Sequence, residues 1–163
     1  MRAEIYEIAM GGSGSLSITA RPRGGDWLPD EVQAWQDAHV DVIVSLLEPD
    51  EQRELDLLDE ASLCEQRGLI FVAYPIPDRG VPQQSSDAKS VIKSLARYVT
   101  QGKHVAIHCR MGIGRSAMVA AATLTVLGET PERAFAMIRE ARGWDVPDTS
   151  EQREWVEKFV ERG

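Results

Sequence analysis

A short loop between two apolar segments constrains this chain more than any other part of its sequence. Residues 103–107 have the length and apolar content of a buried strand, and residues 116–127 are nearly all small or apolar, as in a buried helix. The loop between them reads His-Cys-Arg-Met-Gly-Ile-Gly-Arg. It therefore lies at the carboxyl end of a strand and the amino end of a helix, where free N–H groups and the helix dipole attract an anion.

The residue types in this loop suit it to hold a phosphate group. Gly112 and Gly114 let successive N–H groups turn inward around an anion, and the same field favours a thiolate at Cys109. Arg115 adds a planar fork of donors that can grip two phosphate oxygens at once. The alternative, which a Cys and an Arg at this spacing without the surrounding context would favour, is that Cys109 is a buried core cysteine and Arg115 a helix-start arginine in a surface ion pair.

The order His-Cys, five residues, Arg-Ser resembles the signature of the cysteine-dependent protein tyrosine phosphatases, within their dual-specificity branch. The resemblance is strongest over residues 40–160 and implies one phosphatase domain over residues 1–163. It implies that Cys109 is the nucleophile, that Ser116 eases breakdown of a phosphocysteine, and that His108 orients Cys109 through the backbone. The implied phosphate-binding residues are Arg110, Met111, Gly112, Ile113, Gly114 and Arg115.

A second motif, Pro75-Ile76-Pro77-Asp78-Arg79-Gly80-Val81-Pro82, follows an apolar segment. Its prolines and glycine exclude regular secondary structure, so we expect Asp78 on a stiffened loop. Asp78 precedes Cys109 by 109 − 78 = 31 residues, enough for one helix and one strand between them. In the family such a loop carries the general acid that protonates the leaving oxygen. The alternative is that Asp78 is an ordinary turn residue.

Gln152 carries two hypotheses of equal weight. In the family a glutamine near the start of the last helix often positions the water that hydrolyses the phosphocysteine. Thr149 and Gln152 also stand at the spacing of a capping box, in which the glutamine reaches back to the N–H of the helix cap.

Composition limits the partners and the compartment. The chain has 163 residues and a net charge of −8, which argues against nucleic acid and anionic membranes as partners. No apolar segment is long enough to span a bilayer, and no secretion signal is evident, so we expect a cytoplasmic protein. The sequence leaves the oligomeric state open, with a monomer favoured. Cys64 is expected in the core, with a minor alternative as a resolving thiol. The acidic residues at positions 48–65 are expected on a solvated helix face, or less favourably on a partner-docking surface.

The apolar pattern predicts an α/β fold in a single domain. We expect strands at residues 5–8, 16–20, 40–47, 69–74 and 103–107, and helices at 28–39, 57–67, 85–100, 116–127, 131–141 and 149–162. Strands alternate with helices from residue 40 onward, which predicts a largely parallel twisted sheet with helices on both faces.

The function that this resemblance implies is hydrolysis of phosphorylated protein side chains without a metal or cofactor. The short amino-terminal segment favours a shallow pocket that admits phosphotyrosine together with phosphoserine or phosphothreonine. Arg110, and less favourably Arg79, would meet an extra acidic group near the phosphorylated residue. Two alternatives remain open. One is a small-molecule or phosphoinositide phosphatase, which Met111 and Ile113 disfavour, and the other is a phosphoprotein-binding pseudophosphatase.

Overall fold

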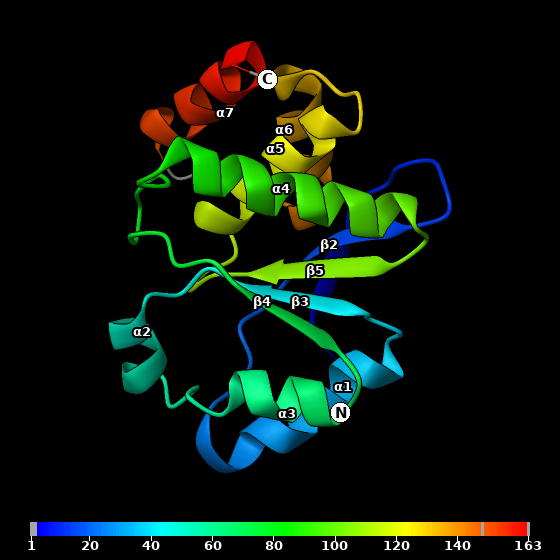
Figure 1. Ribbon diagram of the computed structural model, residues 1–163, viewed down its shortest axis with the longest axis vertical. Coiled ribbons are helices and arrows are strands. Elements are labelled where there is room, and N and C mark those ends of the chain that lie inside the picture. The colour runs from blue at the N-terminus through cyan, green and yellow to red at the C-terminus, as the bar shows by residue number, and fades with distance from the viewer. Residues whose placement is uncertain (1–2, 148, 163) are drawn as a thin grey trace.

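A five-stranded sheet forms the centre of the molecule (Figure 1). The computed structural model describes residues 3–147 and 149–162. The strands lie in the order β1 (Ile5–Glu7), β2 (Ser15–Thr19), β5 (His104–His108), β3 (Val42–Ser45) and β4 (Ile70–Ala73). β1 is antiparallel to β2 and the other neighbours are parallel. The predicted largely parallel sheet is confirmed.

Helices cover both faces of the sheet, as predicted (Figure 1). On one face lie α4 (Ser85–Thr100), α5 (Arg115–Val126), α6 (Pro131–Arg142) and α7 (Ser150–Arg162). On the other lie α1 (Leu28–Asp37) and α3 (Glu60–Gln66), with the short helix η1 (Gly25–Trp27) before α1. No helix in the described ranges is long and apolar enough to cross a membrane.

Alternation along the strands divides the core into two layers. Val42 and Val44 of β3 pack toward α4 and α5, whereas Ile43 between them packs toward α1 and α3. Nearly every residue of α5 is buried, because this helix lies between the sheet and helices α4, α6 and α7. α5 therefore sits as a rigid central helix with its amino end at the carboxyl edge of the sheet.

One helix was missing from the sequence prediction. α2 (Pro49–Glu54) follows β3, begins with Pro49 in its first turn, and is closed by reciprocal hydrogen bonds between Glu48 and Glu51. The expectation that residues 48–65 form a solvated acidic face is wrong for Glu51 and Glu60, which are 8% and 2% exposed. Both carboxylates point inward because each meets a buried basic side chain.

Candidate active site

The signature loop joins β5 to α5, as the sequence predicts. Cys109 follows the last residue of β5 and is 3% exposed. The backbone N–H of Gly112 donates to Cys109 Sγ at 3.3 Å. Gly112 has a φ of 72°, a left-handed conformation that favours glycine, and this turns its N–H toward the sulfur. A hydrogen bond donated to sulfur stabilises negative charge on it.

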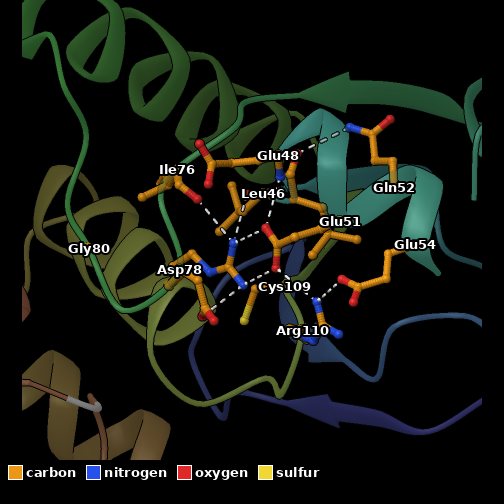
Figure 2. A network of polar contacts seen from close by, with 12 residues as sticks. Leu46, Glu48, Glu51, Gln52, Glu54, Ile76, Asp78, Gly80, Cys109 and Arg110 are labelled. Carbon is orange, nitrogen blue, oxygen red and sulfur yellow. Dashed lines mark hydrogen bonds and ion pairs between the residues drawn. The ribbon is translucent and has the colours of Figure 1, made fainter.

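Arg115 is held from several directions at the start of α5. Its Nη1 and Nη2 atoms donate to Glu51 Oε1 and Oε2 at 2.7 and 2.9 Å, a two-pronged bond that fixes the plane of the guanidinium. Nη1 also donates to the carbonyl of Ile76 at 3.0 Å. Figure 2 shows Glu51, Asp78 and Cys109 gathered around this network.

The buried ion pair shifts the pKa of both partners. Burial by itself would raise the pKa of Glu51, but the hydrogen bonds from Arg115 and the Glu48 N–H, with the charges of Arg115 and Arg110, outweigh burial, so the pKa lies below its usual value. Burial would likewise lower the pKa of Arg115, but the bond to Glu51 and the negative charges of Cys109, Glu51 and Asp78 raise it. Both groups therefore stay charged at neutral pH.

Asp78 lies beside this arginine, on the loop that the prolines were expected to stiffen. Its Oδ1 accepts a hydrogen bond from Arg115 Nη2 at 3.1 Å, and its side chain is 59% exposed. The adjacent turn is closed by the Gly80 N–H, which donates to the carbonyl of Pro77 at 2.8 Å. The structure thus brings Asp78 and Cys109 to the same guanidinium although 31 residues separate them.

Gln152 forms the capping box that was one of its two predicted roles. Its Oε1 accepts from the Thr149 N–H at 3.3 Å, and Thr149 Oγ1 accepts from the Gln152 N–H at 3.1 Å. A third contact was not predicted from the sequence: Gln152 Nε2 donates to the carbonyl of Gly80 at 3.1 Å. Gln152 therefore ties the start of α7 to the loop that carries Asp78. Water positioning by Gln152 stays a prediction.

His108 and Glu60 form a buried pair behind the loop. His108 Nε2 lies 2.6 Å from Glu60 Oε2, and His108 Nδ1 lies 3.3 Å from the carbonyl of Cys109. The ring of Trp35 stacks on the imidazole at 6.0 Å between centroids. His108 thus touches Cys109 through the backbone, and Glu60 and Trp35 fix the orientation of its ring. Glu60 was not singled out from the sequence, because its partner lies 48 residues away.

Ser116 and Cys64 lie on different sides of the sheet. The Ser116 hydroxyl is buried and has no hydrogen-bond partner within the described part of the chain.

Cys64 belongs to the core layer beneath α1 and α3, whereas Cys109 belongs to the opposite layer. Burial, with the charges of Glu60 and Glu65, raises the pKa of the Cys64 thiol to about 12. This environment makes Cys64 an inert core residue and argues against a resolving thiol.

The outer side of the loop is formed by residues 110–113. Arg110 pairs with Glu54 at 3.1 Å and lies 3.7 Å from Glu51. Met111 is 65% exposed, and Ile113 packs partly buried against the core. Over residues 3–147 and 149–162, no group of three or more His, Cys, Asp and Glu side chains is close enough to hold a metal ion.

A family model described as "Polymorphic toxin system, DSP-PTPase phosphatase" matches residues 19–129. The chain belongs to this DSP-PTPase phosphatase family. The membership confirms the resemblance to dual-specificity protein tyrosine phosphatases. The cyclin-dependent kinase inhibitor 3 of Rattus norvegicus is 32% identical over 109 residues, covering 66% of this chain and 50% of that protein. The chain spans about half the length of the first curated relatives it matches.

Solved structures resemble the DSP-PTPase chain over nearly its whole length. A kinase associated phosphatase (KAP), with serine in place of its catalytic cysteine, superposes with a TM-score of 0.90 at 22% identity, over 99% of this chain and 96% of that one. Tk-PTP in its active form gives a TM-score of 0.78 at 26% identity, over 97% and 98% of the two chains. The phosphatase fold is therefore shared from the first strand to the last helix.

Proposed function

We propose that this chain is a cysteine-based protein phosphatase that hydrolyses phosphotyrosine and also phosphoserine or phosphothreonine. The observation that carries the proposal is that Cys109 and Asp78 both lie beside the guanidinium of Arg115. Arg115 Nη2 is 3.1 Å from Asp78 Oδ1. A nucleophile, an anion-binding fork and an acid at one point are the groups that phosphomonoester hydrolysis needs. Membership of the DSP-PTPase phosphatase family supports the same function.

The proposed reaction has two steps. Cys109 Sγ attacks phosphorus and forms an S–P bond, while the bond from phosphorus to the leaving oxygen breaks and Asp78 protonates that oxygen. Arg115 and the loop N–H groups stabilise the charge on the remaining phosphate oxygens. Water then attacks the phosphocysteine, Asp78 takes its proton, and the S–P bond breaks to release phosphate and the Cys109 thiolate.

Three side chains support these steps in the proposal. Glu51 fixes the guanidinium of Arg115 in one plane through its two hydrogen bonds to Nη1 and Nη2. The Ser116 hydroxyl, buried and without a partner in the described residues, is free to donate to the departing Cys109 sulfur. Gln152 holds the loop of Asp78 through the Gly80 carbonyl and is the candidate to position water.

The partners and the setting follow from this chemistry. We propose that residues 1–163 act as one phosphatase domain, that the chain works as a monomer on phosphorylated proteins, and that it needs no cofactor. A thiolate nucleophile requires a reducing compartment, which favours the cytoplasm. Met111 and Ile113 present apolar side chains where a polyphosphorylated inositol would need cations, so the phosphoinositide alternative is less favoured.

The test is turnover by the wild type and by Cys109→Ser. We expect the wild type to release phosphate from phosphotyrosine and phosphothreonine peptides, and Cys109→Ser to lose turnover while it still binds tungstate, because serine keeps the loop but supplies no thiolate. Binding of phosphopeptides without turnover by the wild type would favour a pseudophosphatase. Faster hydrolysis of soluble phosphoinositides than of any peptide would move the chain to the other alternative.

A further inference from the structure

Strand β4 forms one edge of the sheet, and its outer side has free backbone groups. The N–H of Ile70 donates to the carbonyl of Asp41 at 2.9 Å, and the N–H of Tyr74 also donates toward β3. Successive residues of a strand point their N–H and C=O groups to opposite sides, so those of Phe71 and Ala73 point away from β3. No hydrogen bond within residues 3–147 and 149–162 reaches the N–H of Phe71 or Ala73.

This edge carries none of the features that usually protect a free strand. Residues 69–74 read Leu-Ile-Phe-Val-Ala-Tyr, with neither a charge nor a proline. Natural edge strands are protected by charged side chains, prolines or bulges, because a bare apolar edge pairs with any extended chain. The opposite edge, β1, carries such a charge at Glu7. Ala73 is exposed, so another chain can reach its backbone.

The same edge leads directly into the catalytic centre. Beyond Ala73 the chain stays beside the end of β3, since the N–H of Ile76 donates to the carbonyl of Leu46 at 3.0 Å. The carbonyl of Ile76 accepts from Arg115 Nη1 at 3.0 Å, and Asp78 follows two residues later. Three residues span at most about 11 Å, so the exposed edge lies close to the guanidinium proposed to hold phosphate.

We infer that the outer edge of β4 binds an extended segment of the phosphoprotein substrate as an additional strand of the sheet. The inference rests on the proposed function and adds that the substrate is an unfolded segment, recognised through its backbone. An added strand lies about 4.8 Å outside β4. An extended chain therefore needs roughly five residues to run from the segment paired with Ala73 to the phosphate site. A second copy of this chain suits the edge less, because each copy has a net charge of −8.

The test is a scan of N-methylated phosphotyrosine peptides. The probe has about eight residues on each side of the phosphorylated residue, which is long enough to reach the edge in either direction. Each derivative carries one N-methyl group, which removes a single backbone donor. We expect kcat/KM to fall at least about tenfold, or about 1.4 kcal/mol, when alternate residues of the paired segment are methylated. Methylation of the residues between them should change it less than about twofold, because their N–H groups face solvent.

A proline variant then locates the pairing. Ala73→Pro removes the outward N–H and leaves the hydrogen bonds to β3, a position where edge strands tolerate proline. The ratio of kcat/KM between the plain peptide and its most affected derivative should fall below about threefold in this variant. Both peptides have the same leaving group, so a disturbed Asp78 loop cancels from the ratio.

Glu7→Pro is the matched control at the other edge. The N–H of Ile8 donates to the carbonyl of Leu16 at 2.9 Å, so the N–H of Glu7 points out of the sheet as that of Ala73 does. Because β1 lies at the far edge from β4, Glu7→Pro should keep the wild-type ratio. If Ala73→Pro does not fold, the alternation in the wild-type scan decides by itself.

The outcomes separate the added strand from the phosphatase activity. Losses that are absent or equal at all methylated positions, with turnover intact, overturn the added strand and leave the proposed function standing. Absence of turnover on every peptide overturns the proposed function, and equal Kd values for plain and methylated labelled peptides then also overturn the strand. An alternation that survives Ala73→Pro at full size overturns it. So does a wild-type dimer, measured by sedimentation, that Ala73→Pro converts to a monomer, because the edge then binds a second copy.

Discussion

The buried pair between Glu51 and Arg115 offers the sharpest test of how this site is held together. We consider Glu51→Gln, which keeps the shape of the side chain and removes its charge. Wild-type Glu51 accepts two charge-assisted hydrogen bonds from Arg115, at 2.7 and 2.9 Å. The amide of Gln can accept only one of them, and it places an NH₂ group against the other guanidinium nitrogen. Arg115, only 2% exposed, then keeps a charge without its main partner.

The size of the effect follows from the burial of the pair. A broken buried ion pair costs several kcal/mol, and because Gln retains one hydrogen bond we expect a loss of about 3 kcal/mol in the free energy of unfolding. For a chain of this size that corresponds to a fall in Tm of about 6–12 °C. A guanidinium that is no longer fixed in one plane should also lower kcat, by about 100-fold, the usual effect of a misplaced catalytic group.

The lowered pKa of Glu51 determines how the stability difference between wild type and Glu51→Gln changes with pH. The pKa of Glu51 is lowered in the folded protein, so its contribution to stability is full above its ordinary pKa of 4.5 and is lost as the pH falls through the lower folded value. The stability difference between wild type and Glu51→Gln should therefore be largest at neutral pH and shrink in acid.

Urea unfolding followed by tryptophan fluorescence measures this difference. The matched control is Glu54→Gln on the same helix, whose carboxylate is 65% exposed and meets only Arg110 in the described structure. An exposed pair contributes up to about 1 kcal/mol, so the control should lose little. A Glu51→Gln variant as stable as Glu54→Gln at neutral pH, or a difference that stays constant into acid, would refute the argument.

Three further predictions concern the remaining site residues. Asp78→Ala should lower kcat by about 10²–10⁴ on peptides with poor leaving groups and much less on an activated aryl phosphate; a uniform loss would indicate a structural role. Iodoacetamide should alkylate Cys109 much faster than Cys64 at pH 6, because burial raises the pKa of the Cys64 thiol to about 12; equal rates, read by peptide mass spectrometry, would contradict this. Gln152→Ala should lower Tm by about 2–4 °C through loss of a cap worth about 1 kcal/mol. If the variant also accumulates phosphocysteine in a mass spectrum of quenched enzyme, Gln152 positions water, and otherwise it acts as a cap and loop tie.

Local sequence determined the order of the elements and the ends of the main helices. α4 begins and ends where the amphipathic pattern predicts, because its apolar spacing and the glycine that follows it act over a few residues. The same holds for the loop after β5, whose glycines and helix start lie within one short segment. α2 was missed since it is a short helix without an apolar stripe of its own.

Only the tertiary structure decided which charges are buried. Glu51 and Glu60 stand in an acidic segment that looks solvated in sequence, but they meet Arg115 and His108 across 64 and 48 residues. Arg21 reaches the Arg110 carbonyl across 89 residues. Sequence patterns report burial through apolar periodicity, and a carboxylate carries no such signal. The sequence by itself therefore determined the nucleophile loop and the succession of strands and helices along the chain, whereas the place of β5 between β2 and β3 came from the structure. The packing of distant helices against that loop decided which side chains hold it.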